Sequence, residues 1–352
     1  MKHQLKVLFM GRTGSKRTIT GMSQVGKDIT ELLKKADCEV TFLNARDEGM
    51  YGVKQDKPDI IWFYEDTALT WDHLFKLSEL YRHKVPLVFN SMYTYSEDSK
   101  KSIIAILNRF HSKGIKNIFA GVFTEEARNS FGKYKPFVAV LPTTIKLISM
   151  KSELFKDRSG IMLGEFNKFN NPVLTGGLDI YRFVKKLVKA FPGIDLFAYR
   201  HFKLQEAHRL HAYNINGINS HKELDYVQRK VKIIEYTPDL IHTMNTFRAY
   251  VSVVTNETFA MVPAEVQASG IPVLYRDMPQ SLTPHLYYSG YVWDNTNDLI
   301  NALKNIYYDE KIWNTFNRRS LKNYEASCEN DLQYLLRFQL DKIIIRYKGM
   351  CK

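Results

Sequence analysis

Apolar residues recur along this chain in two alternating patterns, short continuous runs and longer stretches with helical spacing. The runs at 5–11 and 38–44 flank residues 22–36, whose apolar positions repeat every three to four residues. Short apolar runs are typical of buried strands, and the second spacing is typical of amphipathic helices. The alternation predicts a parallel sheet covered by helices. The alternation continues with the apolar runs in PDIIWFYED, VPLVFNSM, NIFAGV and FVAVLPTTI. Helices are predicted between the first three of these runs, near 71–83 and near 97–113.

A charged segment at 150–160 ends this alternation, which then begins again. Further apolar runs predict strands, and residues 179–191 have the spacing of an amphipathic helix. Residues 201–229 are polar and rich in His and Asn, so no regular element is predicted there. Two successive α/β units of similar size predict two Rossmann-like domains facing each other across a cleft. The strands of the second unit are expected at 160–164, 193–200, 231–236, 249–254 and 271–275.

The C-terminal part of the chain has helical spacing throughout. The stretch DLQYLLRFQLDKIIIRY is long enough to reach back from the second domain to the first. The same pattern also fits an ordinary helix packed within its own domain. We therefore expect domains at 1–150 and 151–330, followed by a C-terminal helix at 331–352.

The composition is that of a folded globular protein, with 352 residues, 45% hydrophobic and 25% charged. The apolar run at the N-terminus is too short for a signal peptide, and no run of about twenty apolar residues occurs. A soluble, cytoplasmic protein is expected. The cysteines Cys38, Cys328 and Cys351 lack Cys-x-x-Cys spacing, which favours reduced thiols over a zinc site.

The net charge is strongly positive, at +13. Such a charge favours a polyanionic partner, either nucleic acid, an anionic membrane surface or a phosphorylated substrate. Charge alone does not choose among these partners.

The stretch NETFAMVPAEVQASGIPVLY, residues 256–275, places two carboxylates around the start of a helix. Glu257 follows the strand that ends at Val254, so it belongs to the loop beyond the carboxyl end of that strand. Glu265 lies eight residues on, about two helical turns, where it can accept hydrogen bonds from the two hydroxyls of a ribose. A diphosphate can dock on the backbone N–H groups that begin the helix, those of Thr258, Phe259 and Ala260. Together these groups predict a nucleotide-sugar site.

The same stretch resembles the Glu-x7-Glu signature of retaining glycosyltransferases with the GT-B, or double-Rossmann, fold. A second similarity lies in SGYVWDNTNDLINALKNIYYDEKIW, which matches that family's glycine-led strand, acidic turn and helix. The resemblance is specific over about 250–315 and architectural elsewhere. It implies that Glu257 contacts the donor sugar and Glu265 the ribose, with the acceptor bound by the N-terminal domain and the nucleotide-sugar by the C-terminal one.

Other positions of the family match less closely. Glu165 follows Gly164 where the family has an arginine, and TGGLD stands where Lys-Gly is expected. Lys168 and Arg200, each just past a predicted strand, can replace that basic pair electrostatically, although solvated surface cations explain them as well. Gly21 fits the glycine-bearing loop against the donor phosphates, and a simple helix N-terminus explains it nearly as well.

The acceptor domain lacks the histidine that many relatives place after the strand VPLVFNSM, since Asn90, Ser91 and Met92 stand there. Hydroxyl or amide groups would have to orient the sugar instead. No Asp-x-Asp occurs, so no metal ligands are visible. The resemblance implies metal-independent transfer with retention, no cofactor besides a nucleotide-sugar co-substrate, usually a UDP-sugar, and a departing diphosphate that takes the proton of the acceptor.

The acceptor is predicted from a weaker resemblance. GIPVLY and SGYVWDNTND are similar to segments of the DNA α-glucosyltransferases of T-even phages, which modify hydroxymethylated pyrimidines. That resemblance implies duplex DNA as a partner and, for a phage-encoded chain, the host cytoplasm as its location. A basic N-terminal face would hold the DNA phosphates while a base is flipped. Its residues would be Arg12, Lys16, Arg17, Tyr93 and Tyr95, with Lys100, Lys101, Lys113, Lys116, Lys133 and Lys135.

Two alternatives stay open. A lipid-linked or cell-wall glycan at an anionic membrane surface also suits a basic protein. A catalytically inactive protein that binds a sugar nucleotide or nucleic acid would keep the fold without the activity. No obligate protein partner is inferred.

Overall fold

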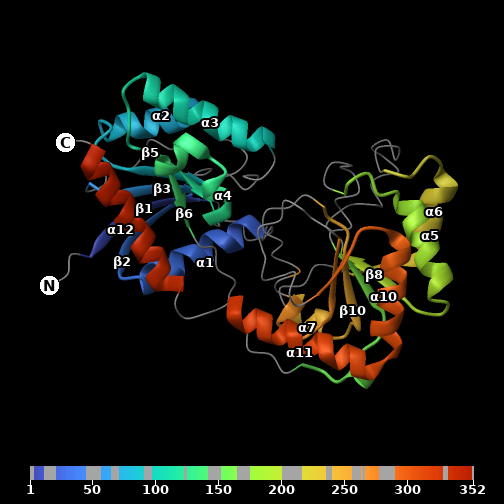
Figure 1. The fold of residues 1–352 in the computed structure, drawn as a ribbon. Coiled ribbons are helices and arrows are strands. Elements are labelled where there is room, and N and C mark those ends of the chain that lie inside the picture. The colour runs from blue at the N-terminus through green and yellow to red at the C-terminus, as the bar shows by residue number, and fades with distance from the viewer. Residues whose placement is uncertain are drawn as a thin grey trace. The chain divides into compact units, whose positions relative to one another are not determined.

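The computed structural model describes residues 4–11, 21–44, 57–64, 71–90, 97–122, 125–141, 152–164, 175–199, 216–234, 240–255, 263, 266–276, 290–327 and 332–350. The chain divides into two compact units (Figure 1). The first comprises Met1–Lys146 together with Cys328–Lys352, and the second comprises Leu147–Ser327. Each unit has its own sheet and its own helices, and each is described by itself below.

The first unit contains a sheet of six parallel strands in the order β2-β1-β3-β4-β5-β6. Strands β3, β4 and β5 are buried at every position, as expected of a parallel sheet covered on both faces. This agrees with their continuous apolar sequence. The strands are β1 (Leu5–Gly11), β2 (Cys38–Asn44), β3 (Ile60–Tyr64), β4 (Leu87–Asn90), β5 (Ile118–Val122) and β6 (Val138–Val140).

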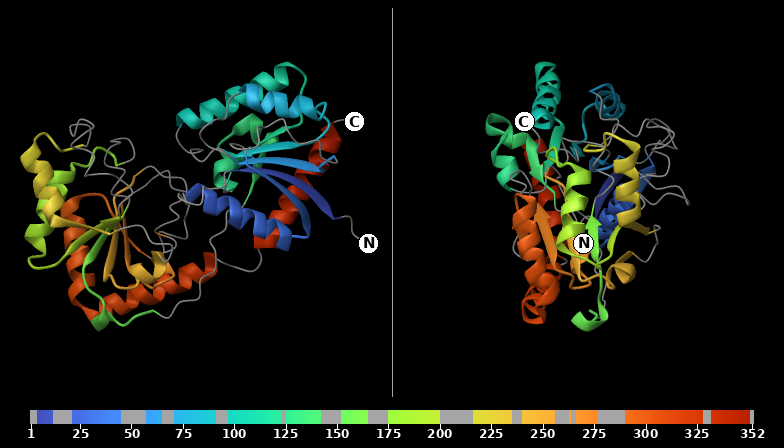
Figure 2. Two further views of the ribbon diagram at one scale, coloured as in Figure 1. Left: turned by 180° about the vertical axis from the view of Figure 1, so that it is seen from behind. Right: turned by 90° about the vertical axis from the view of Figure 1, so that its right-hand side faces the viewer.

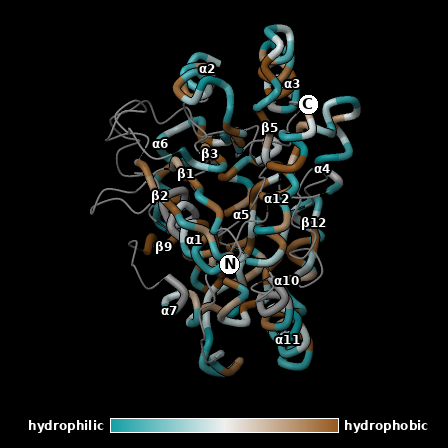
Figure 3. Tube along the Cα trace, turned by 90° about the vertical axis from the view of Figure 1, so that its left-hand side faces the viewer, coloured by the Kyte–Doolittle hydropathy of each residue, from teal (hydrophilic) through white to brown (hydrophobic). Residues whose placement is uncertain are grey.

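Helices cover both faces of this sheet. Two views show α2 and α3 on one face and α1 and α12 on the other (Figures 1 and 2). Figure 3 shows β1 and β3 largely in hydrophobic brown, whereas α4 is mostly hydrophilic. The helices are α1 (Gly21–Lys35), α2 (Trp71–Leu80), α3 (Glu97–Ser112), α4 (Glu125–Asn129), the 3₁₀ helix η1 (Gly132–Phe137) and α12 (Leu332–Met350).

The C-terminal helix α12 belongs to the first unit, so the expectation that it returns to the N-terminal domain is confirmed. Its side chains bond to turns that lead into strands. Arg337 Nη1 donates to the Asp37 carbonyl at 2.9 Å, before β2, and Tyr347 Oη donates to the His83 carbonyl at 2.9 Å, before β4. Arg346 Nη1 donates to the Pro136 carbonyl at 3.4 Å, before β6. Because the strands are parallel, these contacts follow the amino-end edge of the sheet.

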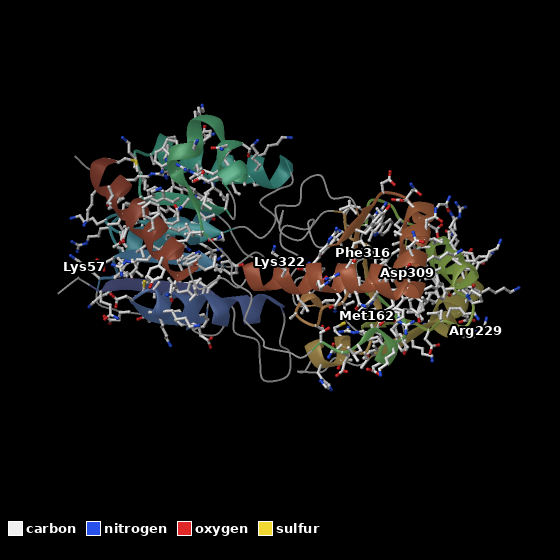
Figure 4. The ribbon with its side chains drawn as sticks, turned by 60° about the horizontal axis from the view of Figure 1, so that its bottom comes forward. Lys57, Met162, Arg229, Asp309, Phe316 and Lys322 are labelled. Carbon is white, nitrogen blue, oxygen red and sulfur yellow. The ribbon has the colours of Figure 1, made fainter. Side chains whose placement is uncertain are left out.

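The second unit has a sheet of six parallel strands in the order β12-β11-β10-β7-β8-β9. Read from β9, this is the 3-2-1-4-5-6 order of dinucleotide-binding domains. In this unit the side chain of Met162, on β7, is buried, whereas that of Arg229 is exposed and projects outward (Figure 4). Lys57, in the first unit, is exposed in the same way. The strands are β7 (Ile161–Gly164), β8 (Leu196–Tyr199), β9 (Val231–Ile234), β10 (Ala249–Ser252), β11 (Val273–Arg276) and β12 (Tyr291–Trp293).

The core of the second unit lies between its sheet and its amphipathic helices. Phe183 and Leu187 of α5 pack with Trp293 and Leu303 in one buried cluster, where the rings of Phe183 and Trp293 stack at 6.2 Å. The helices are the 3₁₀ helix η2 (Phe155–Asp157), α5 (Ile180–Ala190), α6 (His221–Lys230), α7 (Leu240–Met244), α10 (Thr296–Tyr308) and α11 (Glu310–Ser327).

The prediction that 201–229 is irregular is wrong for its last nine residues, which belong to α6. Leu224 and Val227 are buried on the inner side of this helix, and two apolar positions are too few to stand out in a polar sequence. The helical stretch after β12 is also divided, because Asp309 ends α10 and accepts hydrogen bonds from the N–H groups of Lys311 and Ile312.

Among the described helices, none has the length and apolar character needed to span a membrane.

Candidate functional site

The strand order of the second sheet defines a switch point between β7 and β10. The chain moves outward from β7 to one edge of the sheet through β8 and β9, then returns and moves to the other edge from β10. In such sheets ligands bind outside the carboxyl ends of the strands at the switch point. Here those ends are Gly164 and Ser252, which pair in register.

Gly164 has no room for a side chain, because the ring and hydroxyl of Tyr250 occupy the space that a Cβ atom would take. Tyr250 is fully buried. The chain therefore leaves β7 directly against an aromatic ring of the neighbouring strand. This is a packing reason for a glycine at the end of β7, where the polypeptide turns toward the ligand-binding edge.

A turn at Thr175–Gly177 returns the chain to the same edge before α5. Gly176 has φ +51°, and a Cβ atom there would lie 3.1 Å from Thr255 Oγ1 and 3.5 Å from Arg276 Nη2. The turn thus touches the end of β10 and the end of β11. Arg276 Nη1 donates a hydrogen bond to the Thr175 carbonyl.

Arg276 is a half-buried cation at this edge. It ends β11, and its guanidinium lies 5.5 Å from the ring of Trp293, its register partner on β12. Burial lowers the pKa of Arg276 below its usual value, although an arginine stays protonated at neutral pH. A partly desolvated positive charge at the carboxyl edge interacts more strongly with an anion than a charge in water does.

The helix that follows β10 is described only at its C-terminal end. Val266, Gln267 and Ser269 are fully buried, and Gly270 has φ +70°, the left-handed conformation that commonly ends a helix. Asn317 of α11 donates to the Gly270 carbonyl at 2.7 Å, and Gln267 Nε2 donates to Tyr275 Oη at 2.6 Å. These contacts hold the end of the helix that the sequence predicts to carry Glu265.

A buried arginine supports the same helix end. Arg158 is 1% exposed, and its Nη2 donates to Ser269 O at 2.5 Å and to Asn245 Oδ1 at 2.6 Å. Burial lowers the pKa of Arg158 to about 10, and the charge of Glu153 opposes that change. Since its partners are carbonyl, amide and hydroxyl oxygens of the protein, Arg158 acts as a structural cation.

The carboxyl edge of the first sheet contains a buried amide. Asn90 ends β4, is 1% exposed, and accepts a hydrogen bond from Trp62 Nε1 at 2.6 Å. Its Nδ2 has no partner among the described residues. Gly121, its register partner on β5, leaves the space that this side chain fills.

Of the residues predicted for the donor site, only Gly21 is described, and it is the first residue of α1. The six lysines of the predicted basic face are also described: Lys100 and Lys101 lie on α3, Lys113 and Lys116 precede β5, and Lys133 and Lys135 lie in η1, before β6. The others lie outside the described residues, in segments that follow the carboxyl ends of β1, β4, β7, β8 and β10. They are Arg12, Lys16, Arg17, Tyr93, Tyr95, Lys168, Arg200, Glu257, Thr258, Phe259, Ala260 and Glu265. Sequence reasoning missed Arg276, although its position directly after the apolar run 271–275 was a signal for it.

Within the described ranges, no three His, Cys, Asp or Glu side chains gather in a way that would hold a metal ion.

The solved structures with a similar arrangement of strands and helices include glycosyltransferases. HepE of Anabaena, in complex with UDP and glucose, is similar with a TM-score of 0.64 and 13% identity over 96% of this chain and 98% of HepE. Sucrose-phosphate synthase of Thermosynechococcus elongatus is similar with a TM-score of 0.62 and 13% identity over 96% and 98% of the two chains.

TarM is similar with a TM-score of 0.58 and 15% identity over 81% of this chain and 54% of TarM, so the chain spans about half of TarM's length. No protein-family profile and no curated protein sequence matches this chain. The structural neighbours define the fold, which is GT-B, with two Rossmann-like domains.

Proposed function

We propose that this chain is a glycosyltransferase that moves a sugar from a nucleotide-sugar, a UDP-sugar, to a hydroxyl group. The observation that carries the proposal is the 3-2-1-4-5-6 order of the second sheet, because Glu257 comes five residues after β10, past the switch point where ligands bind in such sheets. The similarity to HepE over nearly the whole of both chains supports it, since HepE was solved with UDP-glucose.

The two domains take different substrates in this proposal. Residues 151–330 hold the donor, with Glu257 on the sugar, Glu265 on the ribose and the N–H groups of 258–260 on the diphosphate. Lys168 and Arg200 add positive charge, and Gly21 lets the first domain approach the donor phosphates. Residues 1–150 hold the acceptor.

The proposed reaction depends on stabilising the negative charge of the leaving group. As the bond between the anomeric carbon and the diphosphate oxygen breaks, negative charge develops on the leaving phosphate. Helix N–H groups and basic side chains stabilise that charge without a metal ion. The acceptor oxygen bonds to the anomeric carbon on the same face, and its proton passes to the departing phosphate oxygen. Attack on the same face, and with it retention of configuration at the anomeric carbon, is what the resemblance to retaining glycosyltransferases implies.

For the acceptor, we propose a hydroxymethylated pyrimidine in duplex DNA. The net charge of +13 supports a polyanionic acceptor. Arg12, Lys16 and Arg17 would contact phosphates, and Tyr93 and Tyr95 would stack near the flipped base.

The test incubates the protein with a panel of radiolabelled UDP-sugars and either hydroxymethylated or plain duplex DNA. Label on the modified DNA alone supports both parts of the proposal. Release of UDP without labelled DNA supports the donor site and rejects DNA, which directs the acceptor search to lipid-linked glycans. UDP binding without turnover of any donor rejects the enzyme in favour of a binding protein.

Two matched variants test the site itself. Glu257→Gln and Glu265→Gln each remove one negative charge and keep the side-chain size, and each is expected to lower transfer strongly. For Glu257, on the reacting sugar, the loss should be at least about 100-fold, a size typical of lost transition-state contacts, whereas for Glu265 it should come from weaker hydrogen bonds to the ribose. Glu310→Gln, an exposed acid on α11, is the control. Near wild-type transfer by both site variants would reject the assignment.

A further inference from the structure

The first unit contains a pocket of about 410 Å³ at the entrance to β6, away from the carboxyl edge. It is lined by Arg128, Gly132, Lys133, Lys135, Pro136 and Arg346. The 3₁₀ helix η1 leads directly into β6, and α12 contacts the turns before β2, β4 and β6. The pocket therefore belongs to the amino-end edge of the sheet, opposite to the edge where ligands of such folds bind.

Two arginines in this pocket have incomplete hydrogen bonding. The side chain of Arg128 is 14% exposed, and its Nη1 bonds to Glu125 at 3.0 Å, but its buried Nε has no partner among the described residues. Arg346 makes one long hydrogen bond, at 3.4 Å, to Pro136 O. The guanidinium groups thus retain N–H donors for a further acceptor.

The pocket also has excess positive charge. Burial lowers the pKa of Arg346, the positive charge of Arg128 lowers it further, and only Glu125 opposes this. Glu125 itself is more than half exposed and already pairs with Arg128. Lys133 and Lys135 add two exposed cations. A bound anion would relieve the repulsion, and guanidinium groups match the geometry of phosphate oxygens.

Positive charge continues beyond the pocket toward the neighbouring strand. Lys113 and Lys116 lie in the segment that leads into β5, beside β6 in the sheet. The ring of His111 is 4.0 Å from that of Phe137 in η1, and the charge of Lys116 lowers the pKa of His111. Lys116 therefore lies near η1, whereas Lys113 lies over the rings of Trp71 and Phe75 on α2. Residues 101–146 contain eight Lys or Arg residues and two Glu. This excess of positive charge is larger than a single bound phosphate would neutralise.

We propose that this pocket binds a phosphodiester group of a nucleic-acid strand through Arg128 and Arg346, while Lys116 contacts a neighbouring phosphate. Such a site would hold the strand through its backbone, independent of base sequence and of sugar transfer. It can therefore be tested without a sugar donor, and its failure leaves the proposed transfer activity untouched.

An anionic bilayer is the competing ligand. Phe338 and Ile345 of α12, on the helix that supplies Arg346, are 53% and 69% exposed. Exposed apolar side chains beside basic ones also suit a membrane surface. The two ligands differ in which side chains they require, because a nucleic acid needs the arginines and lysines but does not need Phe338 or Ile345.

The test measures the affinity of the full chain for a fluorescent 20-mer duplex by anisotropy at several salt concentrations. In the Arg128→Gln/Arg346→Gln variant the affinity is expected to fall about tenfold or more, and the slope of log K against log salt to decrease by about one to two, as for one or two lost phosphate contacts. A Lys133→Gln/Lys135→Gln variant, with both side chains exposed, gives a second reading if the arginine variant unfolds. Arg229→Gln/Lys322→Gln, in the second unit, is the charge-matched control.

Three results would overturn the proposal. The first is an unchanged affinity in both pocket variants, and the second is an equal loss in the charge-matched control. The third is binding of phosphatidylglycerol vesicles that Phe338→Ser/Ile345→Ser abolishes, in a protein with no measurable affinity for the duplex.

Discussion

The end of β7 at Gly164 is packed against the side chain of Tyr250 on β10, so closely that Gly164 cannot carry a Cβ atom without displacing the tyrosine. Both residues are buried. Because these strands flank the switch point, the contact sets the path of the chain as it leaves β7. A glycine here is therefore required by packing, whatever ligand the loop binds.

We predict that Gly164→Ala lowers the free energy of unfolding by about 1–3 kcal/mol, as overpacking in a core does. Chemical denaturation measures the change. In the double variant Gly164→Ala/Tyr250→Ala, loss of the ring and its hydroxyl makes room for the new methyl group. The losses of stability in the two single variants should then sum to more than the loss in the double variant. Strict additivity would show that the ring does not occupy this space.

A second prediction concerns the hydrogen bond between Trp62 Nε1 and Asn90 Oδ1, at 2.6 Å. Asn90→Ala leaves the buried indole N–H without its acceptor, so the free energy of unfolding should fall by about 1–3 kcal/mol. Denaturant unfolding monitored by tryptophan fluorescence gives the value. Asn129→Ala, an exposed asparagine at the end of α4, is the control and should change stability little. Equal stability of the Asn90 variant and the wild type would show that the bond contributes nothing net.

Strands β3, β4 and β5 were predictable because a fully buried parallel strand needs a nearly continuous apolar run. The runs at 5–11 and 38–44 coincide with β1 and β2. Helix α6 was missed because most of its surface is polar. Its start did carry a signal, the Ser-x-x-Glu spacing of Ser220 and Glu223 that is typical of a capping box. Ser220 Oγ accepts from the N–H of Glu223, and Glu223 Oε2 accepts from the N–H of Asn219, one residue before the N-cap.

The site was less predictable than the fold. Its residues were assigned from a motif in the segments after strands, and a motif gives the order of residues along the chain but not their contacts. The partners of Arg276 are Thr175, 101 residues earlier, and Trp293 on the next strand. Contacts of this range depend on strand order and register, which a single sequence does not contain.

A third prediction concerns the pH dependence of stability at His111. Burial and the charge of Lys116 lower the pKa of His111 below its usual 6.5. The folded state therefore binds the proton less readily than the unfolded state does, and stability is lost as the pH falls below about 6.5. His111→Asn should reduce that loss. Melting temperatures of both proteins from pH 7.5 to 5 test this, and parallel curves would exclude His111 as a source of the loss.

The last prediction concerns Arg276, which connects the turn at Thr175–Gly177 to the carboxyl edge of the second sheet. Arg276→Lys keeps the positive charge but loses the planar guanidinium that bonds to Thr175 O and lies over Trp293. If this edge binds the diphosphate of the donor, the turn must be held in place, and UDP should bind more weakly to the variant by about tenfold, or 1.4 kcal/mol.

Isothermal titration with UDP measures this affinity, and Arg229→Lys, an exposed arginine on α6, serves as the control. A thermal melt separates the two roles that Arg276 can have. Weaker UDP binding with an unchanged melting temperature would assign Arg276 to the donor site, because the loss of a contact that only supports the fold would lower the melting temperature. A lower melting temperature with unchanged UDP affinity would instead show that the turn held by Arg276 takes no part in binding UDP.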